Sequence, residues 1–165
     1  MRCLAALAPV LLMTACSSSS SSGGTTGGGT SSDAFVGTWS CMGSSTTNYT
    51  QPPGTPSSTT NTAATVVITD DGMGNLTSLR TPEEAGVPCT LHSKLSSDGK
   101  STTIDMGQTC TSPNGGTVTY TSGGSTLTST TTYSTTSTWN YSGTTMKGMP
   151  LVGTGSSMST CTKKM

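Results

Sequence analysis

The sequence predicts an all-β domain, an antiparallel meander of about eight strands that closes, or nearly closes, into an up-and-down barrel. Three observations predict it. Apolar and polar residues alternate with period two in six successive segments, and short Gly-, Asn- and Asp-rich stretches separate them. Ser, Thr and Gly number 28, 37 and 21 of the 165 residues, and all three are poor helix formers. A β-sandwich is the alternative arrangement.

The alternation predicts which side chains face inward in each strand. In chain order, the residues expected to share a face are Phe35, Trp39 and Cys41; Ala64, Val66 and Ile68; Cys89, Leu91 and Leu95; Ile104, Met106 and Cys110; Val118 and Tyr120; Leu127 and Tyr133. Trp139 and Tyr141 share a face in a further strand. A barrel fits this pattern better than a sandwich, because closure removes the exposed strand edges.

Turn residues predict the connections between these strands. Hairpin-type connections are expected at residues 71–75, 98–99, 113–116, 122–124 and 142–143. Residues 51–62 (QPPGTPSSTTNT) are predicted to form a long polar loop at one open end of the barrel.

The first fifteen residues predict a secretory signal peptide: a short basic start and an apolar run too short to span a bilayer. The segment LMTAC, ending at Cys16, resembles the lipobox of bacterial lipoproteins. That resemblance implies that Cys16 becomes the first mature residue and carries lipid, a diacylglyceryl thioether and an amide-linked acyl chain such as palmitate. The predicted organisation is a signal peptide (1–15), a lipidated Cys and flexible Ser/Gly/Thr tether (16–32), and a β-domain (33–165).

The predicted location follows from this organisation. Several acyl chains together anchor a protein stably to a membrane. In enterobacterial lipoproteins an Asp after the modified Cys favours the inner membrane, and Ser17 stands here instead. The resemblance therefore implies an exported protein anchored in the outer membrane, on its periplasmic face or at the cell surface.

Four cysteines remain in the predicted β-domain, and an even number in an exported domain predicts two disulfides. If residues 98–101 form a hairpin loop, Ser97 pairs with Thr102, so that Cys89 faces Cys110 and Leu95 faces Ile104. Cys41 and Cys161 would then join the first strand to the last. The other two connectivities stay open. A zinc site is disfavoured because no Cys-x-x-Cys spacing occurs.

Gly37-Thr38-Trp39 resembles the Gly-x-Trp signature of the first lipocalin strand, in which the Trp closes the base of the barrel. The whole pattern is also similar to small Thr-rich, Cys-paired lipoproteins of soil deltaproteobacteria. That second resemblance implies no activity.

The residue inventory argues against catalysis, and no cofactor or metal is expected. His92 is the only histidine, and its even position in CTLHSKL predicts that it faces solvent. A catalytic base would need a nucleophile and an orienting carboxylate nearby, and serines are too common in this chain to identify a nucleophile. Residues 70–75 (DDGMGN) lack the spaced acidic series of an EF-hand loop and are more simply a hairpin turn. A net charge of zero excludes nucleic-acid binding by phosphate neutralisation.

The function predicted is a membrane-anchored, non-catalytic binding or interaction module with a monomeric domain. Its partner would be a small apolar ligand or an envelope component. The ligand-binding residues predicted are Trp39, Tyr120, Tyr133 and Trp139. The alternative is a structural surface lipoprotein with a solid barrel and no small-molecule ligand. An interior of hydroxyl groups around an unfilled cavity would favour binding.

Overall fold

Side chains alternate between inside and outside along the strands of the computed structural model, which describes residues 31–84 and 86–165. In the first strand, Trp39 and Cys41 point inward and are buried, whereas the next residue, Met42, points outward and is 71% exposed. Strand geometry imposes this period of two. The inward faces predicted for the segments around Trp39, Val66, Tyr120 and Tyr133 are confirmed.

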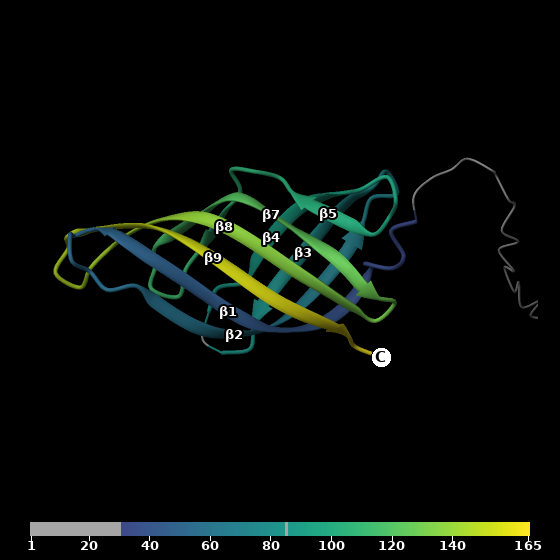
Figure 1. The fold of residues 1–165 in the computed structure, drawn as a ribbon, viewed down its shortest axis with the longest axis horizontal. Coiled ribbons are helices and arrows are strands. Elements are labelled where there is room, and N and C mark those ends of the chain that lie inside the picture. The colour runs from purple at the N-terminus through teal and green to yellow at the C-terminus, as the bar shows by residue number, and fades with distance from the viewer. Residues whose placement is uncertain (1–30, 85) are drawn as a thin grey trace, which may run out of the picture.

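Nine strands lie in the described residues, and they are connected as an antiparallel meander (Figure 1). Their bounds are β1 Gly37–Gln51, β2 Ser58–Asp70, β3 Asn75–Pro82, β4 Cys89–Leu95, β5 Ser101–Ile104, β6 Thr109–Thr111, β7 Thr117–Ser129, β8 Thr132–Thr144 and β9 Pro150–Lys163. The order in the sheet is β5-β4-β3-β2-β1-β9-β8-β7-β6. The N-terminal and C-terminal strands are therefore neighbours in the middle of this order.

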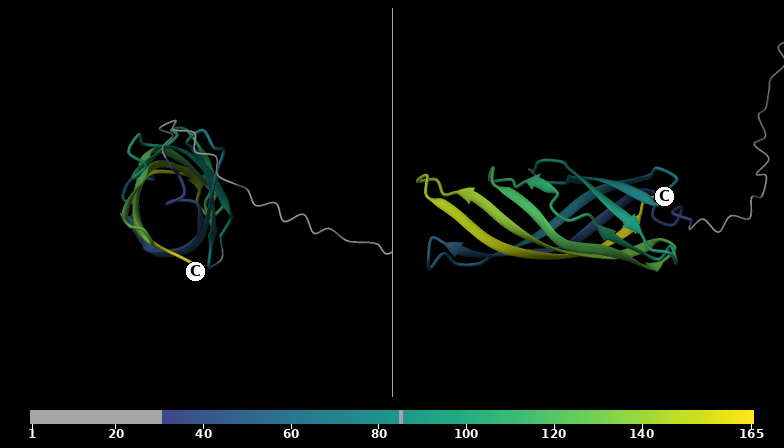
Figure 2. Two further views of the ribbon diagram at one scale, coloured as in Figure 1. Left: turned by 90° about the vertical axis from the view of Figure 1, so that its right-hand side faces the viewer. Right: turned by 90° about the horizontal axis from the view of Figure 1, so that it is seen from above.

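A pairing between β5 and β7 closes the sheet into a barrel of eight strands, with β6 as an extra strand on β7. Figure 2 shows the closed ring in the view along the barrel axis. The predicted up-and-down barrel is confirmed, and closure excludes the sandwich. The closing ladder is short, with three residue pairs between Ser101 and Thr103 of β5 and Gly124 and Thr126 of β7.

Two of the predicted turns are wrong, because their glycines lie inside strands. Residues 122–124 belong to β7 and residues 142–143 to β8, while residues 130–131 and 145–149 make the turns. A Cβ on Gly124 would collide with the carbonyl oxygen of Thr102 in β5. Glycine at this position lets β5 and β7 approach and close the barrel, a use of strand glycine distinct from a turn.

The predicted long loop at residues 51–62 is also wrong in extent. The connection between β1 and β2 is limited to residues 52–57, and β2 begins at Ser58. Thr-rich residues 58–62 pair with β1, where Thr46 faces Thr59 and their hydroxyls lie 3.0 Å apart. Threonine fits a pleated surface well enough to extend the strand without large apolar side chains.

Both predicted disulfides are present. Cys41 and Cys161 face each other across β1 and β9 with Cα atoms 4.0 Å apart, and Cys89 is bonded to Cys110 with Cα atoms 5.6 Å apart. Loop-closure entropy gives about 5 kcal/mol for the first, which spans 120 residues, and about 3 kcal/mol for the second, which spans 21. Disulfides of this kind are typical of exported proteins in oxidising compartments.

The register predicted for the Cys89–Cys110 hairpin is wrong by two residues. Leu95 faces Thr102 and Ser93 faces Ile104, because the loop begins earlier and Ser96 pairs with Ser101. The turn at residues 105–108 then contains two residues beyond the regular strand register, so that Cys110 still lies beside Cys89. Gly107, with φ of +82°, makes this turn.

The same turn overturns the inward position predicted for Met106. Met106 lies in the turn between β5 and β6 and is 78% exposed, because the strand alternation is interrupted there. Ile104 and Cys110, the two partners predicted for that face, are partly buried and pack against the interior.

The side chain of Gln108 extends the barrel wall beside β4 just beyond the last backbone hydrogen bond, in which the Asp105 amide donates to the His92 carbonyl at 3.0 Å. Its Oε1 accepts a hydrogen bond from the His92 amide at 2.7 Å, and its Nε2 donates to the His92 carbonyl at 2.8 Å. The side-chain amide thus reproduces the donor and acceptor of a strand residue. Together with the Cys89–Cys110 disulfide, Gln108 joins β4 to β6, and we call this junction the seam.

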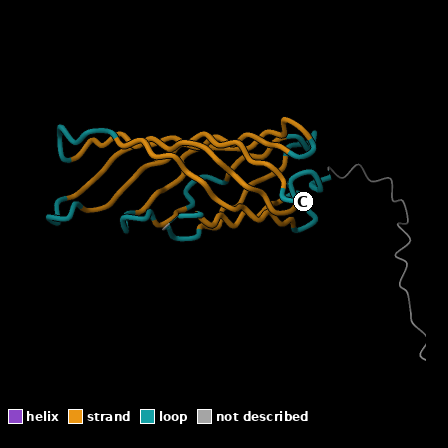
Figure 3. Tube along the Cα trace, turned by 90° about the horizontal axis from the view of Figure 1, so that it is seen from below, coloured by secondary structure: helices purple, strands orange, loops and turns teal. Residues whose placement is uncertain are grey.

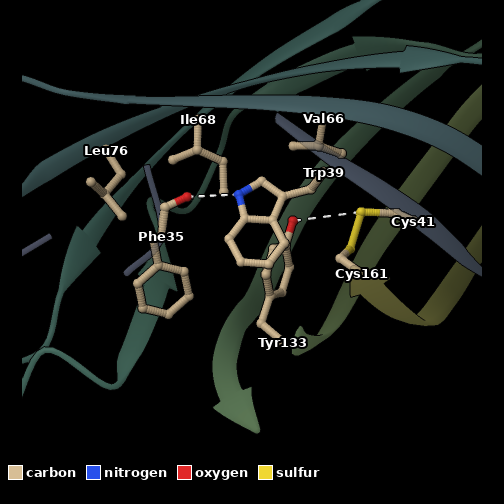
Figure 4. Close-up of a cluster of buried hydrophobic side chains, with 8 residues drawn as sticks. All are labelled: Phe35, Trp39, Cys41, Val66, Ile68, Leu76, Tyr133 and Cys161. Atoms are coloured by element: carbon tan, nitrogen blue, oxygen red, sulfur yellow. Dashed lines mark hydrogen bonds between the residues drawn. A yellow bond between two sulfur atoms is a disulfide. The ribbon is translucent and has the colours of Figure 1, made fainter. Parts of the chain in front are cut away.

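One end of the barrel is closed by a cluster of apolar side chains, which we call the base cluster (Figure 4). Phe35 and Trp39 are fully buried in it, and the Trp39 indole N–H donates to the Phe35 carbonyl at 2.7 Å. Tyr133 packs edge-on against Trp39 with ring centroids 4.7 Å apart. A Trp that closes the base is what the lipocalin resemblance implies.

The chain enters and leaves the barrel at this closed end. Residues 31–36 and the C-terminus both lie there, and the connections β1–β2 and β8–β9 form the opposite tip (Figures 2 and 3). Ser32 is already buried, and its hydroxyl hydrogen-bonds to the Asp70 carboxylate at the end of β2. The predicted signal peptide, Cys16 and the tether up to residue 30 lie outside the described residues.

Removing the Gln108 side chain is expected to open the seam. In Gln108→Ala the amide of His92 loses its acceptor, so its hydrogen exchange should accelerate by about tenfold or more, with a stability loss of about 1–2 kcal/mol. Met106→Ala, in the same turn but exposed, is the control. Unchanged exchange at His92 in Gln108→Ala would contradict this account of the seam.

Candidate functional site

Large side chains fill only part of the barrel interior. The base cluster occupies the closed end, and a second cluster around Tyr120, Trp139 and Tyr141 lies nearer the other end. Between them the interior is lined by small hydroxyl side chains, of which Ser93, Thr102 and Ser137 are buried. A cavity of about 90 Å³, the inner cavity, lies in this band.

A larger cavity of about 450 Å³, the mouth cavity, lies at the end of the barrel opposite the base cluster. Its lining includes residues of the connections β3–β4 and β6–β7, among them Val87 and Pro113. Small-molecule sites in proteins typically enclose a few hundred cubic ångströms or more. The mouth cavity is therefore large enough for a small organic molecule.

Four aromatic rings form one side of the mouth cavity. Tyr120 and Trp139, on β7 and β8, lie with ring centroids 6.3 Å apart, and Tyr49 and Tyr141, on β1 and β8, lie 5.8 Å apart. Both pairs are arranged edge to face, the geometry that aromatic rings prefer. This side offers a broad apolar surface that also carries the phenol hydroxyls of its three tyrosines.

Hydroxyl groups form much of the rest. Ser45 and Thr47 on β1 face Thr60 and Ser58 on β2, and all four line the mouth cavity. Ser112, in the connection β6–β7, lines it as well. The Ser112 Oγ is the one buried side-chain oxygen or nitrogen within the described residues that has no hydrogen-bond partner. The mouth cavity thus combines an apolar wall with a polar one.

Arg80 lies at the boundary between the two cavities. Only Arg80, Tyr120 and Ser157 line both of them among the described residues. The hairpin β2–β3 determines the position of Arg80, since it pairs with Val66 on one side and Cys89 on the other. Val66 is buried in the base cluster, and paired residues share a face. Arg80 therefore points into the barrel.

The sequence reasoning missed Arg80, although a signal was present. The Asp71–Gly74 turn and the inward face of Val66 and Ile68 together determine the register of β3, which places Ser78 and Arg80 inside and Leu79 outside. Leu79 is 42% exposed, the reverse of what hydrophobicity alone suggests. Hairpin register would have identified the arginine where hydrophobicity could not.

Two buried tyrosines flank Arg80. Burial raises the pKa of both Tyr120 and Tyr133, because it disfavours the charged phenolate. The positive charge of Arg80 opposes that rise in both. The guanidinium therefore lies close enough to both phenols to act on them electrostatically, and the phenols stay neutral at ordinary pH.

The structure separates the four residues predicted to bind ligand. Tyr120 and Trp139 come together on the wall of the mouth cavity, and Tyr133 lines the inner cavity. Trp39 is in the base cluster and is not among the residues that line either cavity. Sequence reasoning placed Tyr141 on the face of Trp139, which the mouth cavity confirms, but it did not single out Tyr49.

The other candidate residues lie outside the barrel lumen. His92 is exposed on the outer face, as predicted, and its Nδ1 lies 3.2 Å from the Thr77 hydroxyl. Residues 71–74 form a hairpin turn, in which the Asp71 carboxylate accepts hydrogen bonds from the Asn75 side chain and the Met73 amide. These bonds hold the pKa of Asp71 below its usual value.

Residues 31–84 and 86–165 contain no group of three or more His, Cys, Asp or Glu side chains placed to hold a metal ion. Over the same residues, no helix is long and apolar enough to cross a membrane.

Comparisons with known proteins give no family. No protein-family model matches the chain, and no curated protein matches it significantly. The eight-stranded antiparallel barrel is consistent with a lipocalin-like barrel, and the resemblance extends to architecture alone.

Alkaline pH is expected to destabilise the barrel through its buried phenols. Because the folded pKa of Tyr133 lies above the unfolded value near 10, its contribution is complete below about pH 10 and is lost as pH rises beyond it. In Tyr133→Phe, the fall in unfolding free energy above pH 10.5 should be shallower by up to about 1.4 kcal/mol per pH unit. Urea unfolding measured between pH 8 and pH 12 tests this.

The comparison at pH 8 is the internal control for that variant. Within residues 31–84 and 86–165, the one hydrogen bond of the Tyr133 hydroxyl is a weak one to the Cys41 sulfur at 3.6 Å, so its removal should cost at most about 1 kcal/mol. Equal slopes in the two proteins above pH 10.5 would contradict the burial argument.

Proposed function

We propose that the protein is a membrane-anchored envelope lipoprotein that holds a small amphipathic molecule in the mouth cavity and catalyses no reaction. The observation that carries the proposal is the 450 Å³ cavity with an aromatic wall, open at one end of a closed barrel. The lipobox-like segment ending at Cys16 and the two disulfides support export and anchoring.

The orientation of the barrel suits this role. Residues 31–36 lie at the closed end, so an anchor at Cys16 would join the barrel on the side away from the mouth cavity (Figure 2). The opening would then face away from the membrane surface. A ligand could enter and leave from the aqueous side without displacing the barrel from its anchor.

The alternative of a solid structural barrel is less well supported. It requires apolar side chains that fill the interior, and the described residues instead leave two cavities between hydroxyl-lined walls. Interiors without a functional cavity are packed to nearly crystalline density. The sparse supply of large side chains therefore favours an open barrel.

Filling the cavity tests the binding proposal. Ser45 points into the mouth cavity and Ser44 points outward from the same strand, so Ser45→Trp and Ser44→Trp add the same bulk on opposite faces. Ser45→Trp should weaken binding of the neutral fluorescent probe Nile red by about tenfold or more, and Ser44→Trp should leave it unchanged.

Titrations would use the exported full chain carrying Cys16→Ser, which has no acyl chains to compete for the cavity. Native mass spectrometry of the same preparation would reveal a ligand that co-purifies. If Nile red does not bind to the parent protein, or if both tryptophan variants bind it equally, the mouth cavity is not a ligand site.

The anchor has its own test. Cys16→Ser removes the only thiol available for lipidation in the predicted mature tether, so the protein should move from the membrane fraction to the soluble fraction of fractionated cells. Ser17→Ala is the matched control and should stay in the membrane fraction. Retention of the Cys16→Ser protein in membranes would refute lipid anchoring.

A further inference from the structure

Arg80 is a cation inside the barrel that forms no ion pair with the part of the chain that the structure describes. It is half-buried on the inward face of β3, and the described residues contain no carboxylate within 4.0 Å of it, the ion-pair distance. Among the described residues that line either cavity, Glu84 alone carries a carboxylate, and it is exposed at the mouth. A guanidinium cannot lose its proton, so its charge persists in the lumen.

A charge that is partly withdrawn from water and has no ion-pair partner is costly for folding. The neighbours of Arg80 reduce that cost only in part, because the flanking phenols of Tyr120 and Tyr133 remain neutral. The hydroxyl of Ser157, which lines both cavities, adds another neutral group. The site therefore has a fixed positive charge and surrounding hydroxyls, and none of the described residues places a carboxylate beside the guanidinium.

The apolar wall lies on the mouth side of this charge. Trp139 and Tyr141 line the mouth cavity above the floor formed by Arg80, Tyr120 and Ser157. A molecule that enters the opening meets aromatic rings first and the guanidinium last. An apolar chain would contact the rings, and an anionic group at its end would reach the arginine.

We propose that Arg80 binds the anionic head group of an amphipathic ligand, specifically a carboxylate that carries an apolar chain. The planar guanidinium forms two parallel hydrogen bonds with a carboxylate, and such charge-assisted bonds are about twice as strong as neutral ones. Tyr120 and Ser157 supply hydroxyls beside the same floor. This inference rests on the proposed carrier function and names the class of ligand.

The test compares two ligands that differ only in charge. Dodecanoate and dodecanol have the same chain length, and their affinities can be measured by displacement of Nile red from the exported chain carrying Cys16→Ser. The parent protein should bind dodecanoate about tenfold or more tightly than dodecanol. Arg80→Gln should weaken dodecanoate binding by about 10- to 100-fold and change dodecanol binding by less than about threefold.

Two further variants distinguish recognition of the carboxylate by the planar guanidinium from an effect of positive charge alone and from an effect of a charge elsewhere on the barrel. Arg80→Lys keeps the charge but not the planar fork, so its affinity for dodecanoate should lie between those of the parent and Arg80→Gln. Lys94→Gln removes an exposed charge from the outer face of β4 and should leave both affinities unchanged. Urea unfolding of Arg80→Gln should show no loss of stability, since the lone charge does not stabilise the barrel.

The possible failures are distinguishable. If dodecanol and Nile red bind but Arg80→Gln leaves the preference for dodecanoate intact, the carrier function stands and the role of Arg80 is refuted. A large loss of stability in Arg80→Gln with unchanged affinity would assign a structural role to the arginine. If no probe binds to the parent protein, the carrier function and this inference both fail.

Discussion

Closure of the barrel between β5 and β7 is the constraint on which the rest of the structure depends. β5 has only four residues, and three residue pairs join it to β7. Without this ladder both strands would expose unpaired backbone groups, and the lumen would open along its side. Gly124 permits the close approach of the two strands. Beyond this ladder, between β4 and β6, the Gln108 side chain and the Cys89–Cys110 disulfide continue the barrel wall.

The composition explains why a closed barrel of this size is hollow. Closure of eight strands sets the width of the interior independently of the side chains that are available to fill it. Here the large inward residues gather in the base cluster and around Trp139, while serine and threonine occupy the positions between. Threonine satisfies the β-propensity of the wall without filling the lumen. A sequence poor in large apolar residues thereby produces a stable wall and an unfilled interior, which the disulfides help to stabilise.

Local patterns predicted most of the fold because strand periodicity is a local property. The inward faces of Trp39, Val66 and Tyr133 follow from alternation, and the pairing Cys89–Cys110 follows from hairpin geometry even though its register was two residues off. Glycine was the main source of error. A glycine favours a turn and a close strand approach equally, so only the neighbouring strand distinguishes the turn at Gly107 from the approach at Gly124.

By itself, the sequence predicted antiparallel strands, most of the residues that point inward and the favoured pairing of the four cysteines, since each follows from spacing along the chain. It also determined the lipobox-like segment at Cys16. Only the tertiary structure decided where along the barrel axis each inward residue lies. The stagger of the strands separates Trp39, at the base, from Trp139, at the mouth, and brings Arg80 to the boundary of two cavities, where no carboxylate of the described residues pairs with it. That arrangement depends on the long-range pairing that closes the barrel, which has no local signature in the chain.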